Sequence, residues 1–145
     1  MGLFSKLFGG KEAAYPALDP ASAGAQRIEN FRLQLESLIK KVNDRYEAVP
    51  AQNALYVFLG SPPDMFGIVW FLEGDAEEHN LKKLMAKKGL SMKKGEGIMQ
   101  KLRTAYTEVE NEARYSTLAA GKQVIIVPSD SFADKLYTIL HVMDE

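Results

Sequence analysis

Apolar residues in the first part of the chain recur every three or four positions, with charged residues mostly between them. The stripe consists of Ile28, Phe31, Leu35, Leu38, Val42 and Tyr46. This spacing is typical of an amphipathic helix. Asp19 and Pro20 resemble a helix cap followed by proline at the first helical position. The pattern predicts one long helix from about Pro20 or Ser22 to Ala48, ended by Pro50.

Two nearly continuous apolar runs, Ala54–Gly60 and Phe66–Leu72, follow this helix. Both are rich in β-branched and aromatic residues and are bounded by turn residues, as strands are. The segment Ser61–Met65 between them has about the length of a hairpin loop. Because polar alternation is absent, both strands are expected in the centre of a sheet. The core is expected to contain Val57, Phe58, Trp70 and Phe71.

The second half of the chain predicts three helices and one more strand. Asp75 resembles a cap with Glu78 at the third helical position, and Gly89 would stop this helix. A second long helix is predicted at Ile98–Ala119, and a third strand at Gln123–Pro128. The last helix is capped within Ser129–Ser131. Its inner face is Phe132, Leu136, Ile139, Leu140 and Met143.

The element order is therefore α-β-β-α-α-β-α, which predicts an α+β or α/β fold. We expect a single layered domain over residues 21–145, with a three-stranded mixed or antiparallel sheet packed by helices. Residues 1–20 form an amphipathic N-terminal arm and linker, because Lys11–Pro20 has neither a helical nor a strand period. As an alternative, the long first helix pairs with a second chain in a homodimer.

Composition narrows the function classes without choosing one. The 145 residues include no cysteine, which excludes disulfides, thiolate metal sites and cysteine nucleophiles. The net charge of −1 argues against attraction of the whole protein to nucleic acid. No apolar stretch approaches the ~20 residues of a membrane span, and the apolar part of the N-terminus is too short for a secretory signal. We expect a cytoplasmic protein, with a peripheral position at the inner membrane face as the alternative.

No arrangement of residues identifies an enzyme. Serines that follow the predicted strands lack the Gly-x-Ser-x-Gly motif, and the glycines near Gly89 and Gly95 lack the spacing of a phosphate-binding loop. We therefore predict no catalytic residue and no cofactor. If a pocket exists, it is expected at the strand ends, where loops converge. Its residues would be Ser61, Asp64, Ser129 and Asp130.

Metal binding has one weak candidate. His79 follows Asp75 by four residues, so both would share one side of the predicted helix. A metal site needs further ligands, and only Glu73 and Glu78 lie near. A helix cap at Asp75 with a solvated His79 explains the same pattern, so no metal is assigned.

The N-terminus carries large apolar residues ahead of the predicted linker. Leu3, Phe4, Leu7 and Phe8 have helical spacing, whereas Ser5 and Lys6 lie on another side. Such a segment suits a membrane surface or a hydrophobic groove on a partner protein. The alternative is that it docks on its own domain.

A basic cluster occupies residues 82–103, interrupted only by Glu96. Its members are Lys82, Lys83, Lys87, Lys88, Lys93, Lys94, Lys101 and Arg103. The simplest interpretation is a solvated lysine-rich surface. The alternatives are a surface that binds anionic lipid, an acidic protein or DNA. The stretch partly resembles a helix-turn-helix, but Met85 stands where alanine is usual and Gly95 where an apolar anchor is needed.

These patterns favour a non-catalytic interaction or adaptor protein, held to a protein partner or a membrane surface by the arm, with the basic cluster as a second contact. Two alternatives stay open. One is a nucleic-acid-binding regulator that uses the basic cluster; the other is a small ligand-binding domain or enzyme with its site at the strand ends.

Overall fold

The computed structural model describes residues 15–141, and in that range it contains five helices and six strands. The helices are α1 (Ala23–Asn30), α2 (Arg32–Lys41), α3 (Leu81–Lys88), α4 (Met92–Glu108) and α5 (Asp130–His141). The strands are β1 (Tyr46–Pro50), β2 (Ala54–Ser61), β3 (Met65–Leu72), β4 (His79–Asn80), β5 (Tyr115–Ala119) and β6 (Lys122–Ile126).

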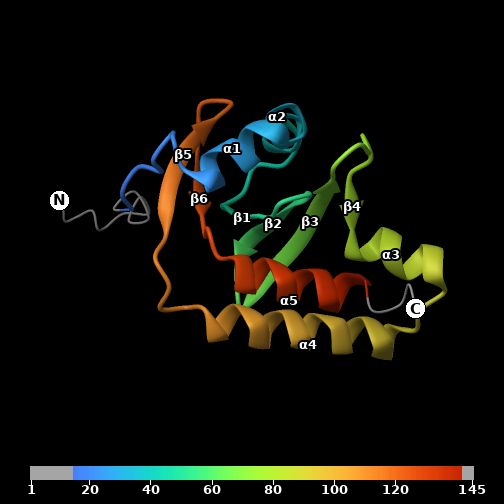
Figure 1. Cartoon of the computed structure of the whole chain (residues 1–145). Helices are drawn as coiled ribbons and strands as arrows, with labels where there is room; N and C mark the ends of the chain where they lie inside the picture. Colours follow the sequence, from blue (N-terminus) through green and yellow to red (C-terminus); the bar gives the residue numbers. More distant parts are fainter. Residues whose placement is uncertain (1–14, 142–145) are drawn as a thin grey trace.

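All six strands belong to one mixed sheet of order β4-β3-β2-β1-β6-β5 (Figure 1). Only β1 and β6 run parallel, and the other neighbours are antiparallel. The predicted hairpin of β2 and β3 is confirmed over its full length, from Ala54 opposite Leu72 to Ser61 opposite Met65. The mixed helix and strand composition is confirmed as well. The expectation of three strands is wrong, because three further strands extend the sheet.

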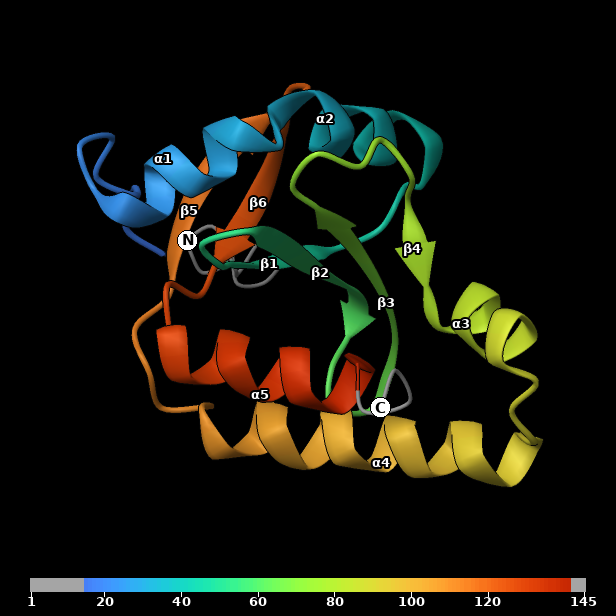
Figure 2. The ribbon, with the colours of Figure 1, turned by 45° about the vertical axis from the view of Figure 1, so that its right-hand side comes forward.

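Helices cover both faces of the sheet. Helices α1 and α2 lie on one face, α4 and α5 lie on the other, and α3 lies beside the edge strand β4 (Figure 2). Alternate residues of the central strands enter opposite cores: Tyr56 and Phe58 face α4 and α5, whereas Leu55 and Val57 face α1 and α2. Such double coverage explains why these strands are apolar throughout. The core residues expected from the sequence, Val57, Phe58, Trp70 and Phe71, are all buried.

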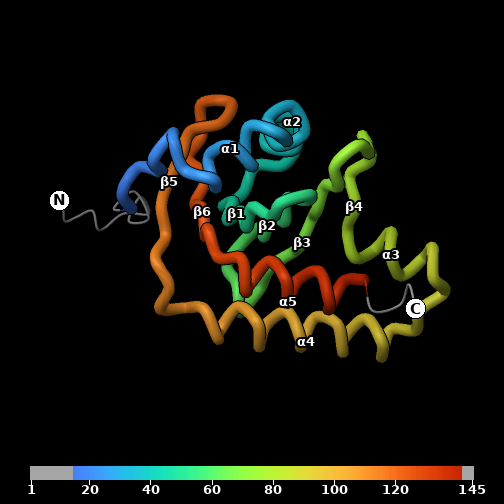
Figure 3. The backbone as a smooth tube through the Cα atoms, in the orientation of Figure 1, coloured from blue at the N-terminus to red at the C-terminus, as the bar shows by residue number. Residues whose placement is uncertain are grey.

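The predicted long first helix is wrong from Val42 to Ala48. The chain is helical only to Lys41, with a break at Phe31, and then enters β1 (Figure 3). Val42 and Tyr46 are four residues apart, a spacing that a helix and an alternating strand can both satisfy. In the structure Tyr46 and Ala48 face one core and Val49 faces the other, which is the two-residue period of a strand.

The apolar face of the predicted first helix packs inside the same chain and so is not left open for a second copy. Ile28, Phe31, Leu35 and Leu38 are buried against the chain's own sheet. Ser22, rather than Asp19, caps α1, since its hydroxyl accepts the backbone N–H of Ala25 at 3.1 Å.

The helix predicted to follow a cap at Asp75 begins five residues later, after a cap at Asn80. The backbone pairs His79 with Trp70 across β3 and β4, so this segment is extended. Asn80 then caps α3 by accepting the backbone N–H of Lys83 at 2.8 Å. Gly89 ends α3 with φ +64, as the sequence predicted.

The second long helix also has different ends from those predicted. Ser91 caps α4, which finishes at Glu108, and residues 115–119 form β5 instead of its last turns. Gly95 lies inside α4 because it meets α3 there: an added Cβ would stand 2.5 Å from Cε of Met85. The final helix is confirmed, with Ser129 accepting the backbone N–H of Phe132 at 3.2 Å. Met143 lies outside the described residues.

The end of the predicted linker is part of the sheet edge. Ala17 forms an isolated parallel bridge with Ser116, and the backbone N–H of Leu18 donates to the Ser116 carbonyl at 2.8 Å. The expectation of a loose linker is therefore wrong for residues 15–18. Hydrogen bonding to β5 accounts for the difference, since this edge strand offers unpaired backbone groups.

Among the described residues, one charged side chain lies almost completely inside the fold. Glu47 of β1 is 1% exposed. Its Oε2 accepts from Nε of Arg114 at 2.8 Å, and its Oε1 accepts from the Tyr106 hydroxyl at 2.8 Å. Nη1 of Arg45 lies 3.3 Å from Oε1. Burial, together with the charge of Glu47, raises the pKa of Tyr106 to about 12, so its hydroxyl is protonated and donates at neutral pH.

We expect Glu47→Gln to lower the free energy of unfolding by about 3–5 kcal/mol, because the Arg114 guanidinium would stay buried without its counter-charge. Urea unfolding measures the change. The matched control is Glu29→Gln, which breaks an exposed ion pair with Arg32 and should cost about 1 kcal/mol or less. Equal losses in the two variants would contradict the central role given to Glu47.

Gly97 is exposed within α4, and nothing lies within 4 Å of a Cβ added there. Gly97→Ala is expected to raise the free energy of unfolding by about 0.5–1 kcal/mol, because alanine has the better helix propensity. Gly89→Ala is the opposite control: its φ of +64 suits glycine, so alanine there should cost about 1 kcal/mol. Thermal or urea unfolding measures the stability of both variants. If Gly89→Ala were the more stable of the two, the assignment of Gly97 to the interior of α4 would be wrong.

Candidate functional site

The basic cluster of the sequence lies on two consecutive helices. Four of its lysines belong to α3, and the other four basic residues belong to α4. Six of them surround the α3–α4 connection and are exposed; these are named the basic surface. They are Lys82, Lys83, Lys87, Lys88, Lys93 and Lys94.

The other two members of the cluster have different surroundings. Nε of Arg103 donates to the Pro63 carbonyl at 3.1 Å, and its guanidinium lies 5.8 Å from the Phe66 ring centre. Arg103 thus fastens the β2–β3 loop to α4. Lys101 lines a groove between α4 and α5 that contains the ion pair of Lys135 and Glu108.

Most of the basic surface lacks acidic partners. Within residues 15–141, Lys82, Lys93 and Lys94 take part in no ion pair, and Lys83 donates to a backbone oxygen, that of Glu78, at 2.9 Å. Residues 81–103 hold eight of the 18 basic side chains and one of the 19 acidic ones. The rest of the chain is therefore acidic, and positive charge is concentrated at this end of the molecule.

A cleft of about 500 Å³ adjoins the basic surface. It lies between α3, strands β3 and β4, and the end of α5, and is named the α3 cleft. The apolar part of its lining includes Trp70, Leu72, Leu84 and Leu140. Its polar lining is Glu77, His79, Asn80, Lys83, Lys87, Lys88 and His141.

His79 is fixed in the wall of this cleft by two contacts. Its ring stacks on Trp70 with 6.0 Å between ring centres and 15° between planes. Its Nε2 lies 3.0 Å from Oδ2 of Asp75. His79 was expected to be solvated, but it is half-buried, because β4 pairs with β3 and so places the ring against Trp70.

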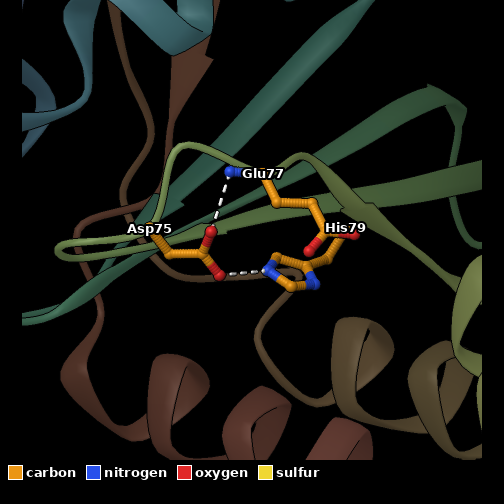
Figure 4. Close-up of side chains that lie close together, drawn as sticks. All are labelled: Asp75, Glu77 and His79. Carbon is orange, nitrogen blue, oxygen red and sulfur yellow. Dashed lines mark hydrogen bonds and ion pairs between the residues drawn. The ribbon is translucent and has the colours of Figure 1, made fainter.

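Asp75 and Glu77 of the turn before β4 come together with His79 at the start of β4, with donor atoms within 4.8 Å of one another (Figure 4). Glu77 replaces the ligand candidates suggested by the sequence, since Glu78 pairs with Lys41 at 2.6 Å. Three such donors could hold part of a metal's coordination shell. The turn has its own internal explanation: Asp75 accepts from the backbone N–H of Glu77 at 2.8 Å and pairs with His79. The contacts of Asp75 therefore stabilise the turn and orient His79.

The four residues expected to form a pocket at the strand ends are not brought together. Ser61 pairs with Met65 at one end of the sheet, near the start of β1. Ser129 caps α5 at the opposite end, and Asp130 pairs there with Arg27 at 2.7 Å. Asp64 lines a separate open hollow of about 660 Å³ beside α4.

The α3 cleft was not predicted from the sequence. Its lining comes from Leu72, Lys83 and Leu140, residues that only the fold brings near one another. The basic cluster was a usable signal for the helical wall, whereas nothing along the chain indicated that α5 closes the other side.

The arm residues Leu3, Phe4, Leu7 and Phe8 lie outside the described residues. Within residues 15–141, every helix falls short of the length and apolar character that crossing a bilayer requires.

The Asp75 carboxylate gives a test of this turn. The backbone hydrogen bond from Glu77, and then the contact with His79, lower the pKa of Asp75 below its ordinary value of 3.8. A lowered folded-state pKa stabilises the fold above pH 3.8, and this stabilisation disappears as the pH falls through the folded-state pKa. Asp75→Asn should therefore destabilise the protein near neutral pH and make little difference at strongly acidic pH. Urea unfolding at both pH values measures this, and a pH-independent difference would contradict it.

Comparisons of the chain with known proteins give no match. No family model matches the chain, and no match is found among curated proteins or among solved structures. The function must therefore be argued from the chain's own geometry, above all from the basic surface and the α3 cleft.

Proposed function

We propose that the protein is a non-catalytic interaction module that docks on an anionic surface through the basic surface of α3 and α4. The arm residues Leu3, Phe4, Leu7 and Phe8 supply a second, apolar contact. Two contacts on one chain bind together more tightly than either does alone, because the second forms at high effective concentration.

The observation that carries this proposal is the position of four lysines. Lys82 and Lys83 lie in the first turn of α3, and Lys93 and Lys94 lie in the first turn of α4. Neither turn contains an acidic residue. The helix dipole disfavours cations at an N-terminus and favours acids there. Helix stability therefore does not explain these lysines, whereas attraction to an external anion does.

An exposed apolar residue accompanies the lysines. Met92, next to Lys93 and Lys94, is 74% exposed. Behind it, Met85, Met92 and Met99 line a hollow of about 260 Å³ between α3 and α4. Lysines around adaptable methionine side chains suit a surface that combines negative charge with apolar groups. An anionic lipid surface has both properties, and so does an acidic protein.

Vesicle flotation tests the proposal with a defined anionic surface. The full-length protein is expected to float with phosphatidylcholine–phosphatidylserine vesicles and not with phosphatidylcholine alone, and salt should weaken the binding. Replacing Lys93 and Lys94 with glutamine should reduce vesicle affinity about tenfold or more, at about 1 kcal/mol for each lysine near the surface. A protein that starts at Lys11 should also bind more weakly, since it lacks the arm.

The matched control replaces Lys40 and Lys122, two lysines outside the basic surface, and should float like the unchanged protein. If both pairs of replacements weaken flotation equally, net charge rather than this surface is responsible. If the full-length protein fails to float, a soluble acidic protein becomes the partner to seek by crosslinking. Salt-sensitive binding to duplex DNA, lost with Lys93 and Lys94, would favour the nucleic-acid alternative.

A further inference from the structure

The α3 cleft has a cationic wall and an apolar wall that face the same space. Lys83 and Lys87 are one helical turn apart, so both belong to the side of α3 that lines the cleft. Lys88 extends the lining, and Glu77 is the only acidic residue among the described residues that line it. Charge in the cleft is therefore net positive.

The apolar wall is made of large side chains from two other elements. Trp70 and Leu72 come from β3, and Leu140 comes from α5. Trp70 is 3% exposed, and its ring stacks on that of His79. The volume of about 500 Å³ is within the range of small-molecule sites, which combine apolar walls with a few convergent polar groups.

We infer that the α3 cleft binds a small organic phosphate, with the phosphate at Lys83 and Lys87 and the apolar or planar body against the wall that contains Trp70. Lysine ammonium groups are compact point charges with three donors, and they are common phosphate ligands. Among the described residues, no arginine lines the cleft.

Several of the lining groups are already held in place. Nζ of Lys83 donates to the Glu78 carbonyl at 2.9 Å, and the Asp75 carboxylate orients His79. The side-chain oxygen of Asn80 is occupied by the cap of α3. A site whose groups are fixed before binding loses less conformational entropy when the ligand arrives. The cleft shares Lys83, Lys87 and Lys88 with the basic surface, but it takes a different ligand and does not include Lys93 and Lys94. The inference therefore does not rest on the proposed function.

The chain's only tryptophan, Trp70, provides the measurement. Adenosine monophosphate and phenyl phosphate are titrated into the full-length protein while its tryptophan emission is recorded, and calorimetry provides an independent affinity. Both probes should change the emission saturably. Adenosine and inorganic phosphate should each bind at least about tenfold more weakly than adenosine monophosphate. Adenosine lacks the group that contacts the lysines, and inorganic phosphate lacks the body that contacts the apolar wall.

Replacing Lys83 and Lys87 with methionine should weaken binding by about tenfold or more, since each lysine makes a charge-assisted contact with the phosphate. The control replaces Lys93 and Lys94, which removes two charges from the same end of the molecule outside the cleft. It should weaken binding less than about threefold, because solvent and salt screen distant charges. Circular dichroism confirms that each variant is folded.

The inference is overturned if neither phosphorylated probe binds, or if the two double variants lose affinity equally. It is also overturned if inorganic phosphate binds as tightly as adenosine monophosphate, because the apolar wall then contributes nothing. Vesicle flotation that depends on Lys93 and Lys94 can succeed or fail independently of these outcomes, so failure of the cleft and failure of the docking proposal are distinguishable.

Discussion

The buried carboxylate of Glu47 is the constraint on which the arrangement of the fold depends. A charge so nearly removed from water is stable only if nearby donors satisfy it. Its donors Arg114 and Tyr106 come from sequence positions 67 and 59 residues away. Arg114 also donates to the carbonyls of Val109, Glu110 and Glu112 beyond the end of α4. Strand β1, helix α4 and the approach to β5 are thereby fixed to one another.

This constraint explains why the residues of β1 and β5 were predicted as ends of long helices. A helical period leaves Glu47 and Arg114, which both lie within predicted helices, on solvated helix faces, since each residue is charged. Burial of both becomes favourable only when the two meet, and that meeting is a property of the folded chain. Elements with strong local patterns were predicted well: β2 and β3 from their apolar runs, and α5 from its serine cap. Elements defined by long-range pairing, such as β4 against Trp70, were missed.

The candidate site divides in the same way. The lysines were visible as a cluster because they are neighbours in sequence and project from consecutive helices. The α3 cleft was not visible, because β3, α3 and α5 contribute its walls from three separate parts of the chain. The four residues placed at the strand ends failed as a group for a topological reason. In a sheet whose central strands are mostly antiparallel, successive loops alternate between the two ends, so Ser61 and Ser129 are separated.

The two ends of the molecule also differ in how charge is treated. Around Glu47, each charge lies beside an opposite charge, and the arrangement serves stability. Around α3, lysines stand at helix N-termini without acidic partners, where they oppose the helix dipole. Helix α3 contains no fully buried residue and packs on the core through half-buried side chains, Leu81 and Leu84. A helix without fully buried residues, whose first-turn lysines oppose its dipole, would gain stability from an anion that binds it. Both proposed ligands, an anionic surface and an organic phosphate, supply the negative charge that this end of the chain lacks.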